Sequence, residues 1–361
     1  MTTRRQFLAT SAAATAALGL PGVARAADPL GVALITPSPF GDVGWSHTLR
    51  LGLEGVQAKL GDKVKLTWLE NIPEGPDADR IMQKAVTDGN KVIVAGSFGY
   101  MNGALQLARR FKDVSVLHAS GYQVAPNFAN FAARYFQGTY LMGMAAASLS
   151  KTKRIGSVSA FAIPELITSV NAFALGARAV DPEIEVSVVW VNSWFDPAKE
   201  QAAAKALIAQ GVDVIFSNAQ DTPSVVSACE EAGVYVFNLN SSMKSYAPKK
   251  YLGVVGTDWS PYFIAEVEAH LAGTFKGASH WLGMADKVVY VTDWNPDIPA
   301  EMKARIDKTE AEIAVGSFNP FAGPIRKADG TEVVAAGSAL PDDQILGMDW
   351  HVEGVVTPLP K

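Results

Sequence analysis

The residues in this chain best suited to chemistry are aromatic and polar side chains in short loops that follow apolar runs. The loop "PSPFGDVGWSH" follows the run "GVALIT" and carries Phe40 and Trp45. The loop "GSFGYM" follows the run "KVIVAG" and carries Phe98 and Tyr100. Large rings at such positions are typical of pockets that hold a flat or apolar ligand.

A second set of candidates follows the apolar runs in the later part of the chain. These are Gln137, Trp194, Asn218, Asp221, Asn240 and Trp259. Amides and carboxylates supply donors and acceptors for the edge of a heterocycle, while tryptophan rings stack on its faces. The combination predicts a site for a purine-like ring. Because sugar rings also stack on tryptophan, a sugar is an alternative ligand.

Patterns for catalysis or metal binding are missing from the sequence. The five histidines show no H-x-x-x-H spacing, and the single cysteine, Cys229, lies in the helical pattern "SVVSACEEAG". The sequence contains no nucleophile elbow, Rossmann fingerprint or P-loop. We therefore predict a protein that is not an enzyme and has no catalytic residue, metal site or cofactor.

The apolar runs alternate with helical patterns in two successive series. The predicted strands of the first series are 31–36, 64–70, 91–96 and 114–120, and those of the second are 154–160, 185–192, 212–217 and 234–240. Continuous apolar runs separated by helices are typical of parallel sheets covered on both faces. We predict an α/β fold of two lobes, each a doubly wound parallel sheet, with the ligand in the cleft between the lobes.

The predicted lobes share the chain unevenly. We assign residues 27–133 plus about 260–285 to the first lobe, and about 134–259 plus 286–361 to the second lobe and a C-terminal extension. The segment "GSFNPFAGPIRKADGTE" predicts a hairpin with its turn at "ADG".

The first 26 residues resemble an export signal. Arg4 and Arg5 precede a short apolar stretch and the cleavage motif "ARA", and adjacent arginines indicate twin-arginine export. Cleavage after Ala26 removes three arginines, so the net charge changes from −5 to −8, with 28 basic and 36 acidic residues. We expect a soluble periplasmic chain without a lipid anchor, which binds neither nucleic acid nor an anionic membrane surface.

Three segments resemble the Med or basic-membrane-protein family of ABC-transporter substrate-binding proteins. They are "GDVGWSHTLRLGLEG", "VIVAGSFGYMNGALQLARRF" and "FDPAKEQAAAKALIAQGVDVIF", and the last is the most specific. The resemblance covers nearly all of the predicted mature chain. It implies a type I periplasmic-binding-protein fold, a purine nucleoside or nucleobase as ligand, and an ABC permease of the inner membrane as partner. It also implies that Trp45 and Trp194 stack on the two faces of the base.

Some positions depart from that family's pattern. The chain has "LNSSM" where nucleoside-binding members have "VDxDQ" to hold ribose, Trp259 in the loop that often carries a lysine, and Gln137 in place of a glutamate. These departures favour a free nucleobase such as adenine over a nucleoside. The alternatives are a receptor for a sugar, an amide or an amino acid, for which Arg134 and Asp221 are candidates, and a sensor that signals to a membrane kinase. We expect a monomer.

Overall fold

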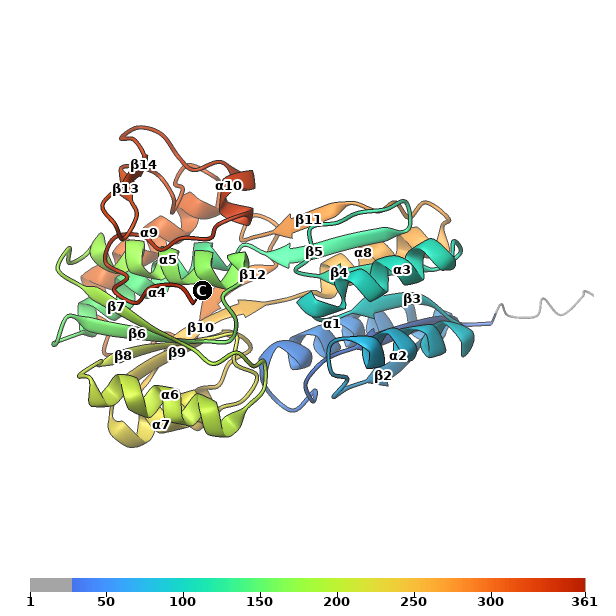
Figure 1. Ribbon diagram of the computed structural model, residues 1–361, viewed down its shortest axis with the longest axis horizontal. Coiled ribbons are helices and arrows are strands. Elements are labelled where there is room, and N and C mark those ends of the chain that lie inside the picture. Colours follow the sequence, from blue (N-terminus) through green and yellow to red (C-terminus); the bar gives the residue numbers. More distant parts are fainter. Residues whose placement is uncertain (1–27, 361) are drawn as a thin grey trace, which may run out of the picture.

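The computed structural model describes residues 28–360, and the predicted export signal of residues 1–26 lies outside the described part. The chain forms two lobes, each built on a six-stranded sheet (Figure 1). Apolar runs such as "NKVIVA" and "VIFSN" form central strands of these sheets and are largely buried. The predicted α/β fold with two doubly wound lobes is confirmed.

The first lobe has the strand order β11-β5-β4-β3-β1-β2, and all neighbouring strands are parallel. Its strands are β1 (Leu30–Ile35), β2 (Val64–Leu69), β3 (Asn90–Ala95), β4 (Ser115–Ala119), β5 (Phe128–Ala133) and β11 (Ser279–Leu282). Its helices are α1 (Gly44–Leu60), α2 (Pro76–Thr87), α3 (Met101–Arg110) and α8 (Ser260–Leu271). Helices α1 and α8 pack together on one face, and α2 and α3 pack together on the other.

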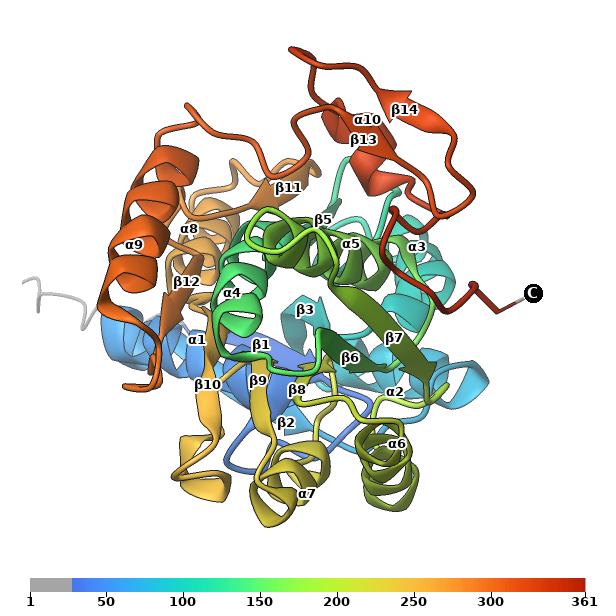
Figure 2. The same cartoon turned by 90° about the vertical axis from the view of Figure 1, so that its left-hand side faces the viewer.

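The second lobe repeats this order as β12-β10-β9-β8-β6-β7, with β12 antiparallel to β10. Its strands are β6 (Arg154–Ser159), β7 (Glu185–Trp190), β8 (Val214–Asn218), β9 (Tyr235–Asn240), β10 (Tyr251–Thr257) and β12 (Val289–Thr292). Its helices are α4 (Tyr135–Leu149), α5 (Pro164–Arg178), α6 (Pro197–Ala209), α7 (Ser224–Ala232) and α9 (Ala300–Ala314). Figure 2 shows α4 and α5 on one face of this sheet and α6 and α7 on the other.

The chain crosses between the lobes after β5, again after β10, and finally between β11 and β12. Because β11 joins the first sheet and β12 the second, each lobe is completed by a segment distant in the sequence. The parallel strands of both lobes point their carboxyl ends toward the space between the lobes (Figure 1), and antiparallel β12 is the exception. In doubly wound folds this edge of the sheet is where ligands bind.

The C-terminal segment packs on the second lobe. It contains the predicted hairpin, formed by β13 (Ile325–Arg326) and β14 (Glu332–Val334), and the short helix α10 (Asp342–Leu346). Arg134, at the crossing after β5, forms an ion pair with Asp342 of α10. The C-terminal segment is thereby fastened beside one of the connections between the lobes.

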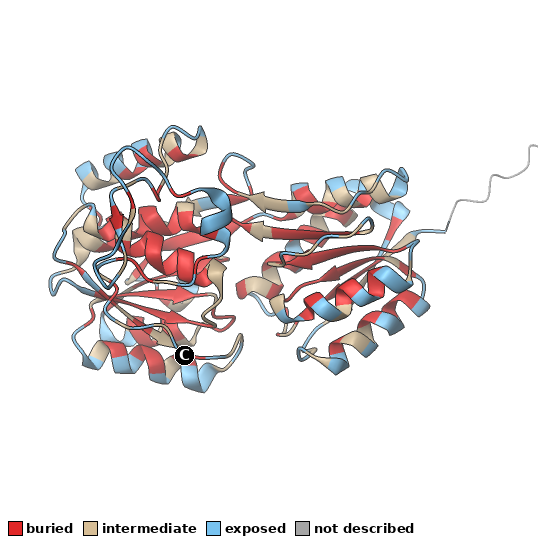
Figure 3. Ribbon diagram, turned by 45° about the horizontal axis from the view of Figure 1, so that its top comes forward, coloured by how far each residue is buried: buried red, intermediate tan, exposed pale blue. Residues whose placement is uncertain are grey.

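The degree of burial differs between the strands and the helices. The central strands of both lobes are buried, whereas the outer faces of the helices are exposed (Figure 3). Cys229 is buried in the core of the second lobe, and burial raises the pKa of its thiol. Within residues 28–360, no helix combines the length and the apolar character needed to cross a membrane.

Candidate ligand-binding site

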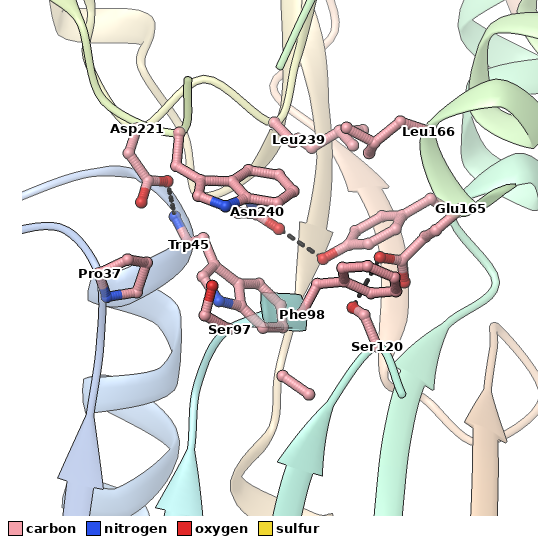
Figure 4. A pocket seen from close by; sticks show the side chains of 14 residues that line it. Pro37, Trp45, Ser97, Phe98, Ser120, Glu165, Leu166, Asp221, Leu239 and Asn240 are labelled. Carbon is pink, nitrogen blue, oxygen red and sulfur yellow. Dashed lines mark hydrogen bonds between the residues drawn. The ribbon is translucent and has the colours of Figure 1, made fainter. Parts of the chain in front are cut away.

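A cavity lies between the lobes at the carboxyl ends of the strands. Its volume is about 490 Å³, which includes space open to solvent. Fourteen residues line it (Figure 4): Pro37, Trp45, Ser97, Phe98, Ala119, Ser120, Tyr135, Glu165, Leu166, Trp194, Ala219, Asp221, Leu239 and Asn240. Both lobes supply lining residues, so a ligand in the cavity contacts both of them.

Trp45 forms a fixed aromatic wall on the side of the first lobe. It lies in the first turn of α1, and its Nε1 donates a hydrogen bond to the Gly96 carbonyl oxygen over 2.9 Å. Its ring meets Trp259 edge to face, with 5.8 Å between ring centroids, and stacks on Phe131 at 6.5 Å. These contacts fix the plane of the ring before a ligand arrives, which reduces the entropy cost of binding.

Trp194 reaches the cavity from the second lobe, in the loop between β7 and α6. Its ring packs on Phe161, with 4.6 Å between centroids, and its Nε1 donates to Glu74 Oε1 of the first lobe over 3.2 Å. The side chain of Asp196 caps α6 and so fixes the end of this loop. Phe98, from the turn after β3, adds a third aromatic side chain to the lining.

Asp221 holds the two lobes together. Its Oδ1 accepts a hydrogen bond from the backbone N–H of Trp45 over 2.6 Å, and its Oδ2 accepts one from the Ser38 hydroxyl. Nearby, the backbone N–H of Gly44 donates to Ser241 Oγ over 2.7 Å. Burial raises the pKa of Asp221 to about 6. Both oxygens of Asp221 are therefore engaged by protein groups in this closed arrangement.

Glu165 places a second carboxyl group in the cavity, from the first turn of α5. Its Oε2 accepts a hydrogen bond from Ser120 Oγ of the first lobe over 2.7 Å (Figure 4). Its Oε1 is buried and has no hydrogen-bond partner among the described residues. Burial raises the pKa of Glu165 to about 7. This carboxyl group, unlike that of Asp221, has a free oxygen.

Tyr135 and Asn240 add a polar pair from the second lobe. The Tyr135 hydroxyl donates to Asn240 Oδ1 over 2.5 Å. Burial raises the pKa of Tyr135 well above its ordinary value, so the hydroxyl stays neutral. Because the amide oxygen of Asn240 accepts this hydrogen bond, the amide N–H groups of Asn240 remain available as donors.

The backbone around the cavity adopts uncommon conformations. Ser120, Ala219 and Asn240 all line the cavity and have φ values of 56°, 58° and 77°. Each lies at or just after the carboxyl end of a strand. Residues other than glycine cost free energy in this left-handed region, and such positions tend to cluster at binding sites.

Three of the aromatic residues predicted for the site lie in the hydrophobic core instead. Phe40 packs edge to face on Trp68, with 5.7 Å between centroids, and is 5% exposed. Tyr100 is 1% exposed, and its hydroxyl donates to the Ile72 carbonyl oxygen. Trp259 is fully buried behind Trp45. Trp259 supports the ring of Trp45, and none of these three rings lines the cavity.

Two of the predicted amides also lie outside the cavity. Gln137 Oε1 accepts a hydrogen bond from the backbone N–H of Met284 over 2.8 Å, which ties α4 to the connection between β11 and β12. Asn218 Nδ2 donates to Ser159 Oγ over 3.0 Å and to the Leu166 carbonyl oxygen over 3.2 Å. Both amides hold neighbouring elements in place. Of the predicted site residues, the lining includes Trp45, Phe98, Trp194, Asp221 and Asn240.

The sequence interpretation missed several lining residues. The polar ones are Ser97, Ser120, Tyr135 and Glu165, and the apolar ones are Pro37, Ala119, Leu166, Ala219 and Leu239. The loop after β6, "AFAIPEL", was the only signal for Glu165. An acidic residue after proline at the start of a helix is common, so this signal was weak.

The lining favours a neutral, largely flat ligand. Its acidic groups are the carboxyls of Glu165 and Asp221, and none of the described residues lining the cavity is Arg, Lys or His. A ligand carboxylate or phosphate would find no cation here. Two lobes that close around one small-molecule cavity, with an aromatic wall on each, define a substrate-binding protein.

Comparison with known proteins identifies the family. The profile described as "ABC transporter substrate-binding protein PnrA-like" matches residues 30–317, and the chain belongs to this family. Members are solute carriers rather than enzymes, and they bind a small molecule and an ABC permease. The resemblance to the basic-membrane-protein family is therefore confirmed.

Individual relatives are named for different ligands. A purine-binding protein of Brucella abortus (strain 2308) is 40% identical over 97% of this chain and 99% of the relative. A putative ABC transporter glucose-binding protein of Haloferax volcanii is 32% identical over 82% of this chain and 75% of the relative. The fold is similar to that of an ABC transporter solute-binding protein from Aeropyrum pernix K1, with a TM-score of 0.72 and 16% identity, over 88% of this chain and 95% of that structure.

Proposed function

We propose that this protein captures a free purine base, such as adenine, and delivers it to an ABC importer. The observation that carries the proposal is the cavity itself, in which Trp45, Phe98 and Trp194 converge from both lobes. A flat heterocycle stacks on such rings and needs few polar partners. The purine-binding relative at 40% identity supports the same class of ligand.

The polar groups of the cavity favour a base over a nucleoside. The oxygens of Asp221 are engaged by Trp45 and Ser38, and Ser241 Oγ is engaged by Gly44. Each of these oxygens already accepts a hydrogen bond from the protein, so a ribose hydroxyl would compete with contacts between the lobes. A ribose buried without partners for its hydroxyls would bind poorly, because each unpaired buried polar group costs about 1–3 kcal/mol.

The alternatives fit the cavity less well. An amino acid needs a cation for its carboxylate, but the Arg134 guanidinium pairs with Asp342 and lies over the Trp281 ring, outside the cavity. A sugar is favoured by one observation, the relative named for glucose. Each buried sugar hydroxyl needs a partner, and this lining is mostly apolar.

We also propose that the protein is located in the periplasm. Arg4, Arg5 and the apolar stretch after them support twin-arginine export to the periplasm, where the receptor meets its permease. Fractionation of cells that express the full chain tests this step. Recovery of an uncleaved chain from the cytoplasm alone would contradict it.

A thermal-shift panel tests the choice of ligand. The protein is melted with adenine, hypoxanthine, adenosine, D-glucose or L-glutamate, since ligands that bind the native state raise the melting temperature. We expect the largest rise with a free base, a smaller one with adenosine, and none with glucose or glutamate. A rise with glucose alone would show that the fold was interpreted correctly and the ligand wrongly.

A further inference from the structure

Among the described residues that line the cavity, Glu165 has the one carboxyl group with an oxygen left for a ligand. Ser120, from the opposite lobe, donates to Oε2 over 2.7 Å, whereas Oε1 is buried and without a partner among the described residues. The same side chain also lines a neighbouring cavity, which it shares with Phe98 and Ser120. A buried polar atom without a partner is costly, so Oε1 indicates a place for a polar atom of the ligand.

Among residues 28–360, those that line the two cavities beside Glu165 supply no compensating positive charge. The titratable groups lining the binding cavity with it are Tyr135 and Asp221, and those lining the neighbouring cavity are Tyr122 and His280. Burial lowers the pKa of His280, which keeps the imidazole neutral at ordinary pH. None of the described residues lining either cavity is Arg or Lys.

Burial therefore decides the charge of this carboxyl group. It raises the pKa of Glu165 to about 7, against the Ser120 hydroxyl and the nearby backbone N–H of Ala133, which favour the anion. A ligand that fills the cavity removes still more water from around the carboxyl group. Glu165 lies in the first turn of α5, where the helix dipole favours the anion. That effect is smaller than the cost of burying a carboxylate in a mostly apolar cavity.

We propose that Glu165 determines ligand specificity by binding in its neutral form, with the proton on Oε1 donated to a pyridine-type nitrogen of the ligand ring. Oε2 then remains the acceptor for Ser120, which matches the hydrogen bond seen in the structure. The inference rests on the proposed function and narrows it to heterocycles that present a bare ring nitrogen to Glu165, as adenine does. If a ligand presented only an N–H group to Glu165, two hydrogen-bond donors would face each other without an acceptor. Such a ligand would bind poorly.

In this proposal, Glu165 takes up a proton from solution when the ligand binds. Ser120 and Glu165 belong to different lobes, so opening the cleft separates them and returns the carboxyl group to solvent. Its pKa falls toward the ordinary range when the cleft opens and rises when the cleft closes on a ligand. A group with the higher pKa in the bound state contributes affinity that is complete at low pH and is lost as pH rises through that pKa.

Titration calorimetry with adenine at pH 6.5, 7.5 and 8.5 tests the proposal. Adenine stays neutral over this range, and repeating each titration in two buffers of different ionisation enthalpy counts the protons taken up. We expect affinity to fall about 10-fold between pH 6.5 and 8.5, since one linked proton changes affinity by at most tenfold per pH unit. Proton uptake should be largest at pH 6.5, which lies between the pKa of the open form and that of the bound form, and should fall toward zero as the pH rises past the bound pKa.

Two variants assign the effect to Glu165. Glu165→Gln keeps a donor of the same shape without a titrating proton, so it should bind adenine equally at all three pH values and more tightly than the wild type at pH 8.5. Glu165→Leu should bind weakly throughout. Melting curves without ligand establish that both variants are folded.

Three results would overturn the inference. The first is wild-type affinity that is constant or rises with pH, which would mean that ionised Glu165 accepts a hydrogen bond from the ligand or takes no part. The second is a Glu165→Gln variant that keeps the wild-type pH profile. The third is the absence of adenine binding at any pH, which would overturn the proposed function itself and the inference with it.

Discussion

At the scale of single residues, the site depends on which aromatic rings face the cleft. Trp45 and Trp259 are neighbours, yet Trp45 lines the cavity and Trp259 is buried behind it. The sequence predicted both for the site, because composition shows that a loop is aromatic but not which way each ring turns. Tyr100 and Phe40 were predicted for the site for the same reason, and both are buried away from the cavity. Trp45, Phe98 and Trp194 line the cavity, and their contact with a ligand stays a prediction.

Replacing Trp194 tests the second aromatic wall. Trp194→Ala removes a stacking surface, so we expect adenine binding to weaken by about 1–3 kcal/mol, as for base–aromatic stacks elsewhere. Titration calorimetry measures the change. Phe195→Ala is a matched control, since Phe195 is the next residue, is 42% exposed and does not line the cavity. Equal affinity for the wild type and Trp194→Ala would remove Trp194 from the site.

At the scale of elements, continuous apolar runs made the prediction of most central strands straightforward. Strands β5, with "FANFAA", and β11, with "SHWL", were not predicted, because their short runs are interrupted by polar residues. The short helix α10 has too few residues for a periodic pattern. The first turn of α1 carries a feature that no pattern revealed. Gly44 has φ = 92°, and a Cβ there would lie 2.8 Å from Asp221 Oδ1.

Replacing Gly44 tests whether this close approach matters for closure. In Gly44→Ala the new methyl group collides with Asp221 across the lobe boundary, and overpacking of this kind costs about 1–3 kcal/mol. We expect weaker adenine binding by a corresponding factor, measured by calorimetry. Gly41→Ala is the control, because Gly41 also has a positive φ, 47°, but its Cβ would meet nothing within 4 Å. If the two variants lose affinity equally, backbone strain and not the lobe contact is responsible.

At the scale of the whole molecule, the lobes are joined by polar contacts around the cavity. Besides the contacts of Asp221 and Glu165, the Tyr246 hydroxyl donates to Asp42 over 2.8 Å and Trp194 donates to Glu74 over 3.2 Å. A ligand that contacts both walls adds to these contacts only when the cleft is closed, and so favours the closed form.

The sequence predicted the two lobes, because each follows from a local series of runs and helices. The contacts between the lobes were not predictable, because each joins residues far apart in the chain. Asp221, for example, meets Ser38 across 183 positions. It was predicted as a ligand-binding residue, whereas the structure uses both its oxygens to hold the lobes together.

The measurement that most directly tests the central claim is a crystal structure of the protein with adenine. We expect a planar ring in the cavity lined by Trp45, Phe98 and Trp194, with a bare ring nitrogen at hydrogen-bond distance, ~2.7–3.2 Å, from Glu165 Oε1. The lobes should be closed, with Asp221 still bound to Trp45 and Ser38. A purine ring found outside this cavity, or a cavity that takes a sugar and leaves adenine unbound, would contradict the account.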